Sequence, residues 1–239
     1  MRPFRPEPLT DFSKEENVKA IRAALENAKR NFGKRYPIII NGKEYTTDKV
    51  FKSFNPAHKD EVIGEFYAAG EREADLAIES AWKAFDLWKN FPAEERAGFL
   101  FKAAEILRRR RFEIAAWMVY EVGKNWVEAD ADVAEAIDYL DYYAHQMLEY
   151  AGNRPLAHIY GENNEYFYIP LGVVVVIPPW NFPLAILTGM TVAAVVTGNT
   201  VILKPASDSP MMGYLFMDVM REAGLPDGVI NFLPGSGGS

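Results

Sequence analysis

Residues 173–205 read VVVVIPPWNFPLAILTGMTVAAVVTGNTVILKP, and this stretch determines the predicted fold. Residues 173–177 form an unbroken branched run, which is typical of a strand covered on both faces. A helix is predicted over 182–197, and a second buried strand over 200–203. A second helix at 208–223 and a third strand at 229–233 continue the alternation. This β-α-β-α-β order predicts a parallel sheet with right-handed crossovers.

The residues before this segment predict mostly helices. Apolar side chains recur at helical spacing, and Ser13 with Glu16 has the spacing of a capping box at the start of the first helix. A strand, an Asn41-Gly42 turn and a further strand follow that helix. Two arms of a β-hairpin are predicted after Gly152. The later helices are expected near 71–89, 93–122 and 126–150, and the hairpin arms at 154–160 and 165–169.

Composition excludes several classes of protein. The chain has 239 residues, 49% of them apolar, and a formal net charge of −7, so broad attraction to nucleic acid or to an anionic membrane is not expected. It contains no Cys, which excludes disulfides and a Cys nucleophile within these residues. Residues 1–10 lack an apolar targeting segment, and the apolar run 184–196 is shorter than the roughly 20 residues of a membrane span. The expected compartment is the cytosol.

Two loops follow the first two predicted strands, at residues 177–183 and 204–207. Ligands of open α/β sheets bind beyond the carboxyl ends of the strands, so these loops are expected to lie side by side at a binding crevice. Asn181 is either an N-cap of the next helix or an amide donor for a developing oxyanion. Lys204 is either a snorkelling lysine or a donor to ribose hydroxyls or a phosphate.

Other motifs point less strongly to function. Neither glycine-rich nucleotide fingerprint is present, and Gly235 with Gly237 after the third strand is a weak signal. The histidines lack metal-ligand spacing, so no metal site is predicted. Residues 108–111 are four arginines and are expected to form a solvated or ion-paired face. Glu128, Asp132 and Glu135 share one helix face and are expected to form a solvated acidic stripe.

Several motifs in the same order resemble the aldehyde dehydrogenase superfamily, and within it the Δ1-pyrroline-5-carboxylate (L-glutamate γ-semialdehyde) dehydrogenases. The resemblance runs from about residue 4 to residue 237. It rests on FRPEP at 4–8, YEVGKNW at 120–126, ADVAEAIDY at 131–139, WNFP at 180–183, GNTV at 198–201 and Lys204-Pro205.

The resemblance implies roles for particular residues. Asn181 would be the catalytic oxyanion donor, while Glu135 and Phe182 would belong to the aldehyde substrate region. The cofactor would be NAD. The residues implied in its binding are Ile177, Pro178, Pro179, Trp180, Lys204, Ala206, Ser207 and Gly237. Many NAD-preferring members carry Glu where this chain has Ser207, so NADP is expected to be tolerated.

The resemblance also implies a fold, an α/β aldehyde-dehydrogenase-like structure with a Rossmann-type parallel sheet that is incomplete in this chain. Residues 1–153 would form the helical and strand part of the cofactor-binding domain, and 170–239 its truncated β-α-β-α-β segment. Residues 154–169 would form a hairpin flap for homo-oligomerisation.

The missing cysteine decides what the chain is expected to do by itself. The family mechanism needs a Cys thiolate and a general-base Glu, which lie downstream in the family. The chain is therefore interpreted as the amino-terminal half of an enzyme that oxidises L-glutamate γ-semialdehyde to glutamate in proline degradation. Its expected partners are the small-molecule aldehyde and the missing carboxyl-terminal half. The alternative is a non-catalytic binding or assembly module, truncated or split, on the same scaffold.

Overall fold

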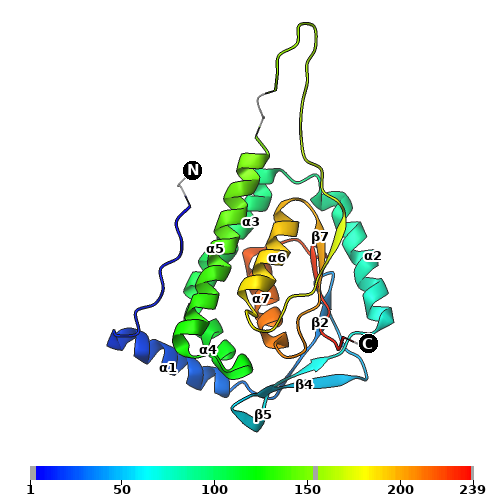
Figure 1. The fold of residues 1–239 in the computed structure, drawn as a ribbon. Coiled ribbons are helices and arrows are strands. Elements are labelled where there is room, and N and C mark those ends of the chain that lie inside the picture. The colour runs from blue at the N-terminus through cyan, green and yellow to red at the C-terminus, as the bar shows by residue number, and fades with distance from the viewer. Residues whose placement is uncertain (1–3, 153–155, 238–239) are drawn as a thin grey trace.

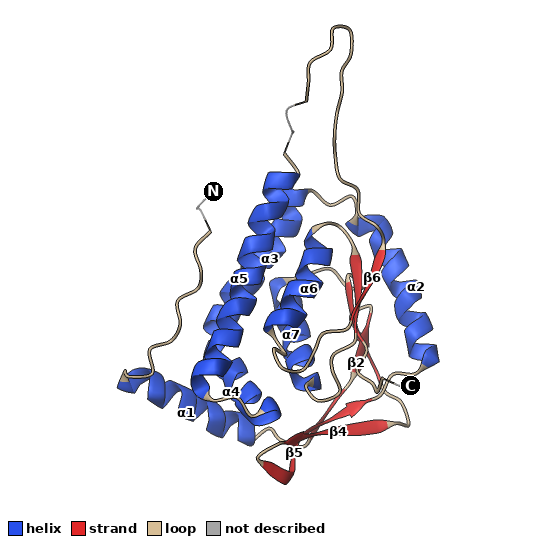
Figure 2. Ribbon diagram, in the orientation of Figure 1, coloured by secondary structure: helices blue, strands red, loops and turns tan. Residues whose placement is uncertain are grey.

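The structure is a computed structural model that describes residues 4–152 and 156–237. A central five-stranded sheet has helix α2 on one face and helices α6 and α7 on the other, and α3, α4 and α5 form the next layer (Figures 1 and 2). The helices are α1 (Glu15–Lys29), α2 (Glu71–Trp88), α3 (Ala93–Arg109), α4 (Arg111–Val122), α5 (Trp126–Tyr150), α6 (Ala185–Val196) and α7 (Pro210–Ala223).

The strands form two sheets. The five-stranded sheet has the order β3-β2-β8-β7-β6, and a three-stranded sheet has the order β1-β5-β4. Their bounds are β1 (Lys34–Tyr36), β2 (Ile38–Ile40), β3 (Lys43–Tyr45), β4 (Val50–Asn55), β5 (His58–Tyr67), β6 (Val173–Val176), β7 (Thr200–Leu203) and β8 (Ile230–Phe232).

The predicted parallel core of the sheet is confirmed. β6 pairs with β7, and β7 pairs with β8, both in parallel. The sheet continues beyond β8 because β2 adds to it antiparallel, with Ile39 opposite Phe232. The hairpin of β2 and β3 turns at Asn41 and Gly42, which both have the positive φ that this tight turn requires. The sequence predicted that hairpin, but not its place in the sheet.

Side chains of the central strands alternate between two apolar layers. Val201 and Leu203 join the large core toward α6 and α7, whereas Ile202 packs into a smaller cluster with Ala77 and Ala81 of α2. The prediction of strands covered on both faces therefore holds for β7. It is wrong for β6, where Val175 is 57% exposed. Among the described residues β6 pairs with β7 alone, so it is an edge strand.

The helical layer has two features that bear on the predictions. The expected helix at 93–122 is divided at Arg110, which lies between α3 and α4. The four arginines at this junction form the predicted ion-paired face. Arg108 pairs with Glu7 and Asp141, Arg109 with Glu222, Arg110 with Glu113 and Asp218, and Arg111 with Asp130.

Two local predictions are wrong. Ser13 does not cap α1, which begins at Glu15; its hydroxyl instead donates to Asp11. Residues 156–169 contain no strand: they form two extended arms that project beyond the end of α5 (Figure 1). A two-stranded ribbon without a covering layer is only marginally stable, which explains the missing ladder. Arg154 and Pro155, part of the predicted arm, lie outside the described residues.

Among the described residues, none of the helices is both long enough and apolar enough to cross a membrane.

Candidate active site

The loops that follow β6 and β7 lie side by side, as the sequence predicts. The Lys204 N–H donates to the Val176 carbonyl at 3.0 Å, so the two strands leave the sheet together. The Leu233 N–H in turn donates to the Leu203 carbonyl at 2.9 Å. Three consecutive strand ends are thereby held at one edge of the sheet, where ligands of parallel α/β sheets bind.

The two loops also share a cavity of about 390 Å³. Trp180 contributes from the first loop, and Ser207 with Asp208 from the second. Its other wall is formed by residues of α4, of β4 and of the turn that follows β4: Glu121, Val122, Lys52, Ser53, Phe54 and Pro56. This arrangement brings together residues that are 27 positions apart in the sequence.

Asn181 lies in the first loop with an exposed side chain. The interpretation of Asn181 as an N-cap is wrong, because α6 begins only at Ala185 and Leu184 occupies the N-cap position. Pro183 delays the start of the helix, since a residue that precedes proline avoids helical geometry. Within the described residues the Asn181 amide makes no hydrogen bond, so its N–H groups are available to a ligand.

The proposed cofactor residues of the first loop differ in exposure. Ile177, Pro179 and Trp180 are exposed, with Trp180 at 53%, whereas Pro178 is buried. An exposed indole next to two prolines is a rigid apolar surface, which suits a planar ligand.

The second loop holds a half-buried lysine. The Lys204 ammonium donates to the Pro205 carbonyl at 3.2 Å, and burial lowers its pKa. The Ser207 hydroxyl donates to the Gly235 carbonyl at 3.1 Å and ties this loop to the turn after β8. Ala206 is half-buried between them, and the space around Gly237 is open.

The two substrate candidates come from different elements. Phe182 follows Asn181 and is 42% exposed. Glu135 is half-buried on α5, where it interacts with the Tyr139 hydroxyl. The ring of Tyr139 packs closely on Gly189 of α6, so α5 and α6 approach each other next to Glu135.

Asp132 of α5 contacts the start of α6, next to the first loop. It is 0% exposed, so the expected solvated stripe is wrong at this position. Its carboxylate accepts the Ala185 N–H at 2.7 Å and the Lys124 ammonium at 2.6 Å. The stripe shows which residues share a face of α5, but it does not show that α6 packs on that face.

Glu121 is a second buried acid with a similar role. Its carboxylate accepts the N–H groups of Met211 and Met212 at the start of α7 and the Ser53 hydroxyl. A helix N-terminus favours a negative charge. The two helices that follow the candidate loops therefore both have their first N–H groups bound by acids of the helical layer.

We expect Glu121 to make stability depend on pH. Burial raises the pKa of Glu121 to about 8 from 4.5, against the effect of its three donors. The folded state then binds more protons than the unfolded state between these values. The free energy of unfolding should fall as pH rises through this range, by at most about 1.4 kcal/mol per pH unit.

Glu121→Gln isolates this effect. At pH 5 the variant should be less stable by about 1–3 kcal/mol, since one amide oxygen cannot accept all three bonds. The difference should shrink toward pH 8, as measured by urea unfolding at several pH values. A difference that stays constant with pH would contradict the assignment.

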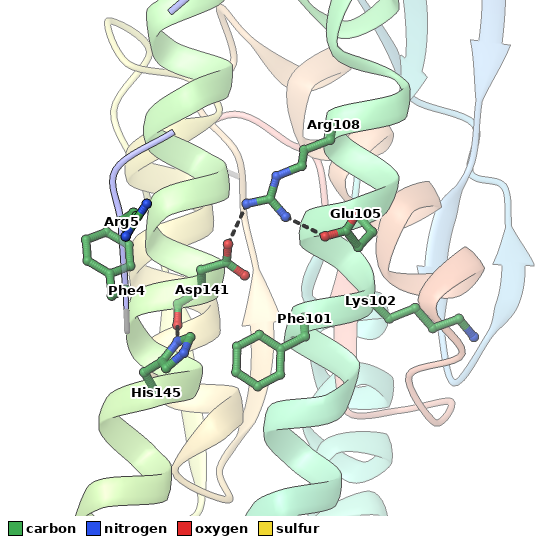
Figure 3. Close-up of a pocket in the computed structure, with 8 residues that line it drawn as sticks. All are labelled: Phe4, Arg5, Phe101, Lys102, Glu105, Arg108, Asp141 and His145. Carbon is green, nitrogen blue, oxygen red and sulfur yellow. Dashed lines mark hydrogen bonds and ion pairs between the residues drawn. The ribbon is translucent and has the colours of Figure 1, made fainter. Parts of the chain in front are cut away.

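A separate cavity of about 760 Å³ lies away from the strand ends, between the N-terminal segment, α3 and α5. Figure 3 shows Arg108 directed at Asp141 and Glu105, with His145 below. The Arg108 guanidinium is thus paired with carboxylates of the protein itself. Across the described residues no group of three His, Asp or Glu side chains is arranged to hold a metal ion.

Comparison with known proteins agrees with this geometry. The model of the aldehyde dehydrogenase family matches residues 43–239. The chain belongs to the aldehyde dehydrogenase family.

Among curated relatives, 1-pyrroline-5-carboxylate dehydrogenase 2 of Halalkalibacterium halodurans is 54% identical over 235 residues, which are 98% of this chain and 46% of that protein. The protein of the same name from Bacillus subtilis is 51% identical, with the same coverage. The chain thus spans about half the length of the curated aldehyde dehydrogenases it matches.

Solved aldehyde dehydrogenase structures show the same fold. The 1-pyrroline-5-carboxylate dehydrogenase from Thermus with bound NAD is 50% identical and matches with a TM-score of 0.97, over 100% of this chain and 46% of that chain. The Δ-pyrroline-5-carboxylate dehydrogenase of Mycobacterium tuberculosis, bound with NAD and cobalamin, is 30% identical, with a TM-score of 0.92 over 99% of this chain and 45% of that one. The predicted α/β aldehyde-dehydrogenase-like fold is thereby confirmed.

Proposed function

We propose that this chain is the cofactor-binding part of an NAD-dependent dehydrogenase that oxidises L-glutamate γ-semialdehyde to L-glutamate. The observation that carries the proposal is the meeting of the Trp180 loop and the Lys204 loop at one sheet edge and one cavity. A relative that is 50% identical over the whole chain is described with bound NAD. Curated relatives at 51–54% identity are named 1-pyrroline-5-carboxylate dehydrogenases.

The residues present fit a dinucleotide. Ile177, Pro179 and Trp180 offer an exposed apolar surface, and Lys204 offers an ammonium at the adjacent strand end. The Lys204 ammonium is half-buried and its described acceptor is a single backbone carbonyl, so ribose hydroxyls would be further acceptors. Bound NAD would supply the hydride acceptor of the oxidation.

Asn181 is the residue of this chain that would act on the aldehyde, as a hydrogen-bond donor to its oxygen. When a nucleophile attacks the carbonyl, negative charge develops on the oxygen, and an amide N–H directed at it stabilises that charge. The attacking thiolate and the general-base Glu are assigned to residues outside this chain, which contains no Cys. Glu135 and Phe182 are assigned to the substrate side of the same site.

The proposed partners follow from the same assignment. The complementary half would supply the nucleophile and would cover the exposed β6 edge. The arms at 156–169 carry exposed apolar side chains, including Tyr160, Phe167 and Ile169, and are the proposed contact between copies in a homo-oligomer. The proposed location is the cytosol, which the absence of disulfides fits.

The function is tested by adding the missing half. The chain alone, incubated with Δ1-pyrroline-5-carboxylate and NAD, should produce no NADH. The chain mixed with the carboxyl-terminal half of a curated relative should produce NADH, followed by its absorbance. Continued inactivity of the mixture, with NAD bound and both halves folded, would favour a non-catalytic module.

Ser207 makes a prediction about the cofactor. A carboxylate at this position would repel a 2′-phosphate, so Ser207→Glu should lower kcat/KM for NADP by about tenfold in the completed enzyme. The value of kcat/KM for NAD should change much less, although the hydrogen bond from the Ser207 hydroxyl to the Gly235 carbonyl is lost. An equal kcat/KM for NADP in the unsubstituted enzyme and in Ser207→Glu would contradict this role of position 207.

A further inference from the structure

The loop that carries Asn181 leads into a helix that lacks a cap of its own. Leu184 is the N-cap residue of α6 and offers no side-chain acceptor, and the first turn of the helix contains no acidic residue. The Ala185 N–H at the start of α6 would lack an acceptor unless another element supplied one. Asp132 of α5 supplies it by accepting the Ala185 N–H at 2.7 Å.

The cation that pairs with Asp132 is Lys124. Asp132 is fully buried, and burial raises its pKa, while the Lys124 ammonium at 2.6 Å acts in the opposite direction. Lys124 reaches this position because the chain turns sharply at Gly123, where φ is 71°. A buried carboxylate without its cation would be strongly destabilised.

The same ammonium also contacts the loop. Lys124 Nζ lies 4.1 Å from the centroid of the Phe182 ring, which is a cation–π distance. The Phe182 carbonyl accepts the Ile186 N–H at 3.3 Å, so this residue is tied to the helix as well. One cation thus acts on the start of α6 through Asp132 and on the residue next to Asn181 directly.

We propose that Lys124 and Asp132 are positioning residues that fix the Asn181 amide relative to the reacting carbonyl. The proposal rests on the proposed function, since Asn181 is the assigned oxyanion donor. Displacement of a catalytic group by about 1 Å can lower a rate by about a hundredfold, so the support behind this loop matters for the rate. Neither residue needs to touch the substrate or the cofactor.

The first test uses this chain alone and does not depend on its activity. Lys124→Met keeps the aliphatic stem and removes the charge. Hydrogen exchange of the amides at 180–187 should then become about tenfold faster. Arg111→Met is the matched control because it breaks another buried pair with α5, that of Arg111 and Asp130. The control should accelerate exchange near Thr10, which Asp130 also binds, and leave 180–187 unchanged.

The second test is kinetic and uses the chain completed by its carboxyl-terminal half. Lys124→Met should lower kcat at least tenfold with KM for NAD changed less than twofold, and Lys124→Arg should restore most of the rate. Inactivity of the unsubstituted mixture would contradict the proposed function. The hydrogen-exchange test would then decide whether Lys124 and Asp132 position the loop.

Three outcomes would overturn the proposal. One is unchanged exchange at 180–187 in Lys124→Met, and another is an equal change there in the Arg111→Met control. If Lys124→Met does not fold, Lys124→Gln is measured in its place with the same expectation. The third outcome is that neither Lys124→Met nor Lys124→Gln folds while Arg111→Met does. This would show that the Lys124–Asp132 pair maintains the fold as a whole, and it would overturn the proposal.

Discussion

Replacing Asn181 with alanine is expected to lower kcat of the completed enzyme by about 10²- to 10³-fold, the usual effect of removing one oxyanion donor. The amide is exposed and makes no hydrogen bond within the described residues, so its loss should not disturb the fold. The rate is measured as NADH formation from Δ1-pyrroline-5-carboxylate. The unfolding free energy of the chain should change by less than about 0.5 kcal/mol.

Asn181→Asp is the control for the chemistry of the donor. It keeps the size of the side chain but removes the N–H groups and adds a negative charge near the developing oxyanion. Its loss of rate should be at least as large as that of Asn181→Ala. A rate within threefold of the unsubstituted enzyme in either variant would remove Asn181 from the mechanism.

The largest effect on stability is expected at Trp88, near the end of α2. Its side chain is 1% exposed, its ring contacts those of Phe91 and Phe99, and its indole N–H donates to the Val195 carbonyl at 2.9 Å. Trp88→Ala should lower the free energy of unfolding by about 3–5 kcal/mol, because a cavity replaces a large apolar side chain.

Leu87→Ala is the matched control, since Leu87 precedes Trp88 in the same helix and is 72% exposed. It should change stability by less than about 0.5 kcal/mol. Both values come from urea unfolding followed by circular dichroism. Similar losses in the two variants would show that the effect does not depend on the burial of the indole.

The parts of the fold that the sequence predicts well are those set by neighbouring residues. The apolar runs around Val173 and Val201 predict strands, and the Asn41-Gly42 pair predicts a hairpin turn. Both features are visible within a few residues of chain. The two loops at Trp180 and Lys204 follow from them, because parallel strands carry their carboxyl ends to the same edge.

The parts that were missed depend on residues far apart in the chain. Asp132 is one of three acids on a helix face, and nothing in that spacing shows that the start of α6, 53 residues later, packs there. Glu121 lies 90 residues from the N–H group of Met211. A charged side chain is ordinarily expected at the surface, so the burial of these acids can be recognised only once their distant donors are known.

The position of β2 has a consequence for the order of folding. Ile39 pairs with Phe232, and the Asn231 side chain accepts the Asn41 N–H across 190 residues of sequence. A contact of this kind closes a long loop, and such contacts slow folding. During synthesis β2 leaves the ribosome long before β8, so this side of the sheet can be completed only after residue 232 has emerged.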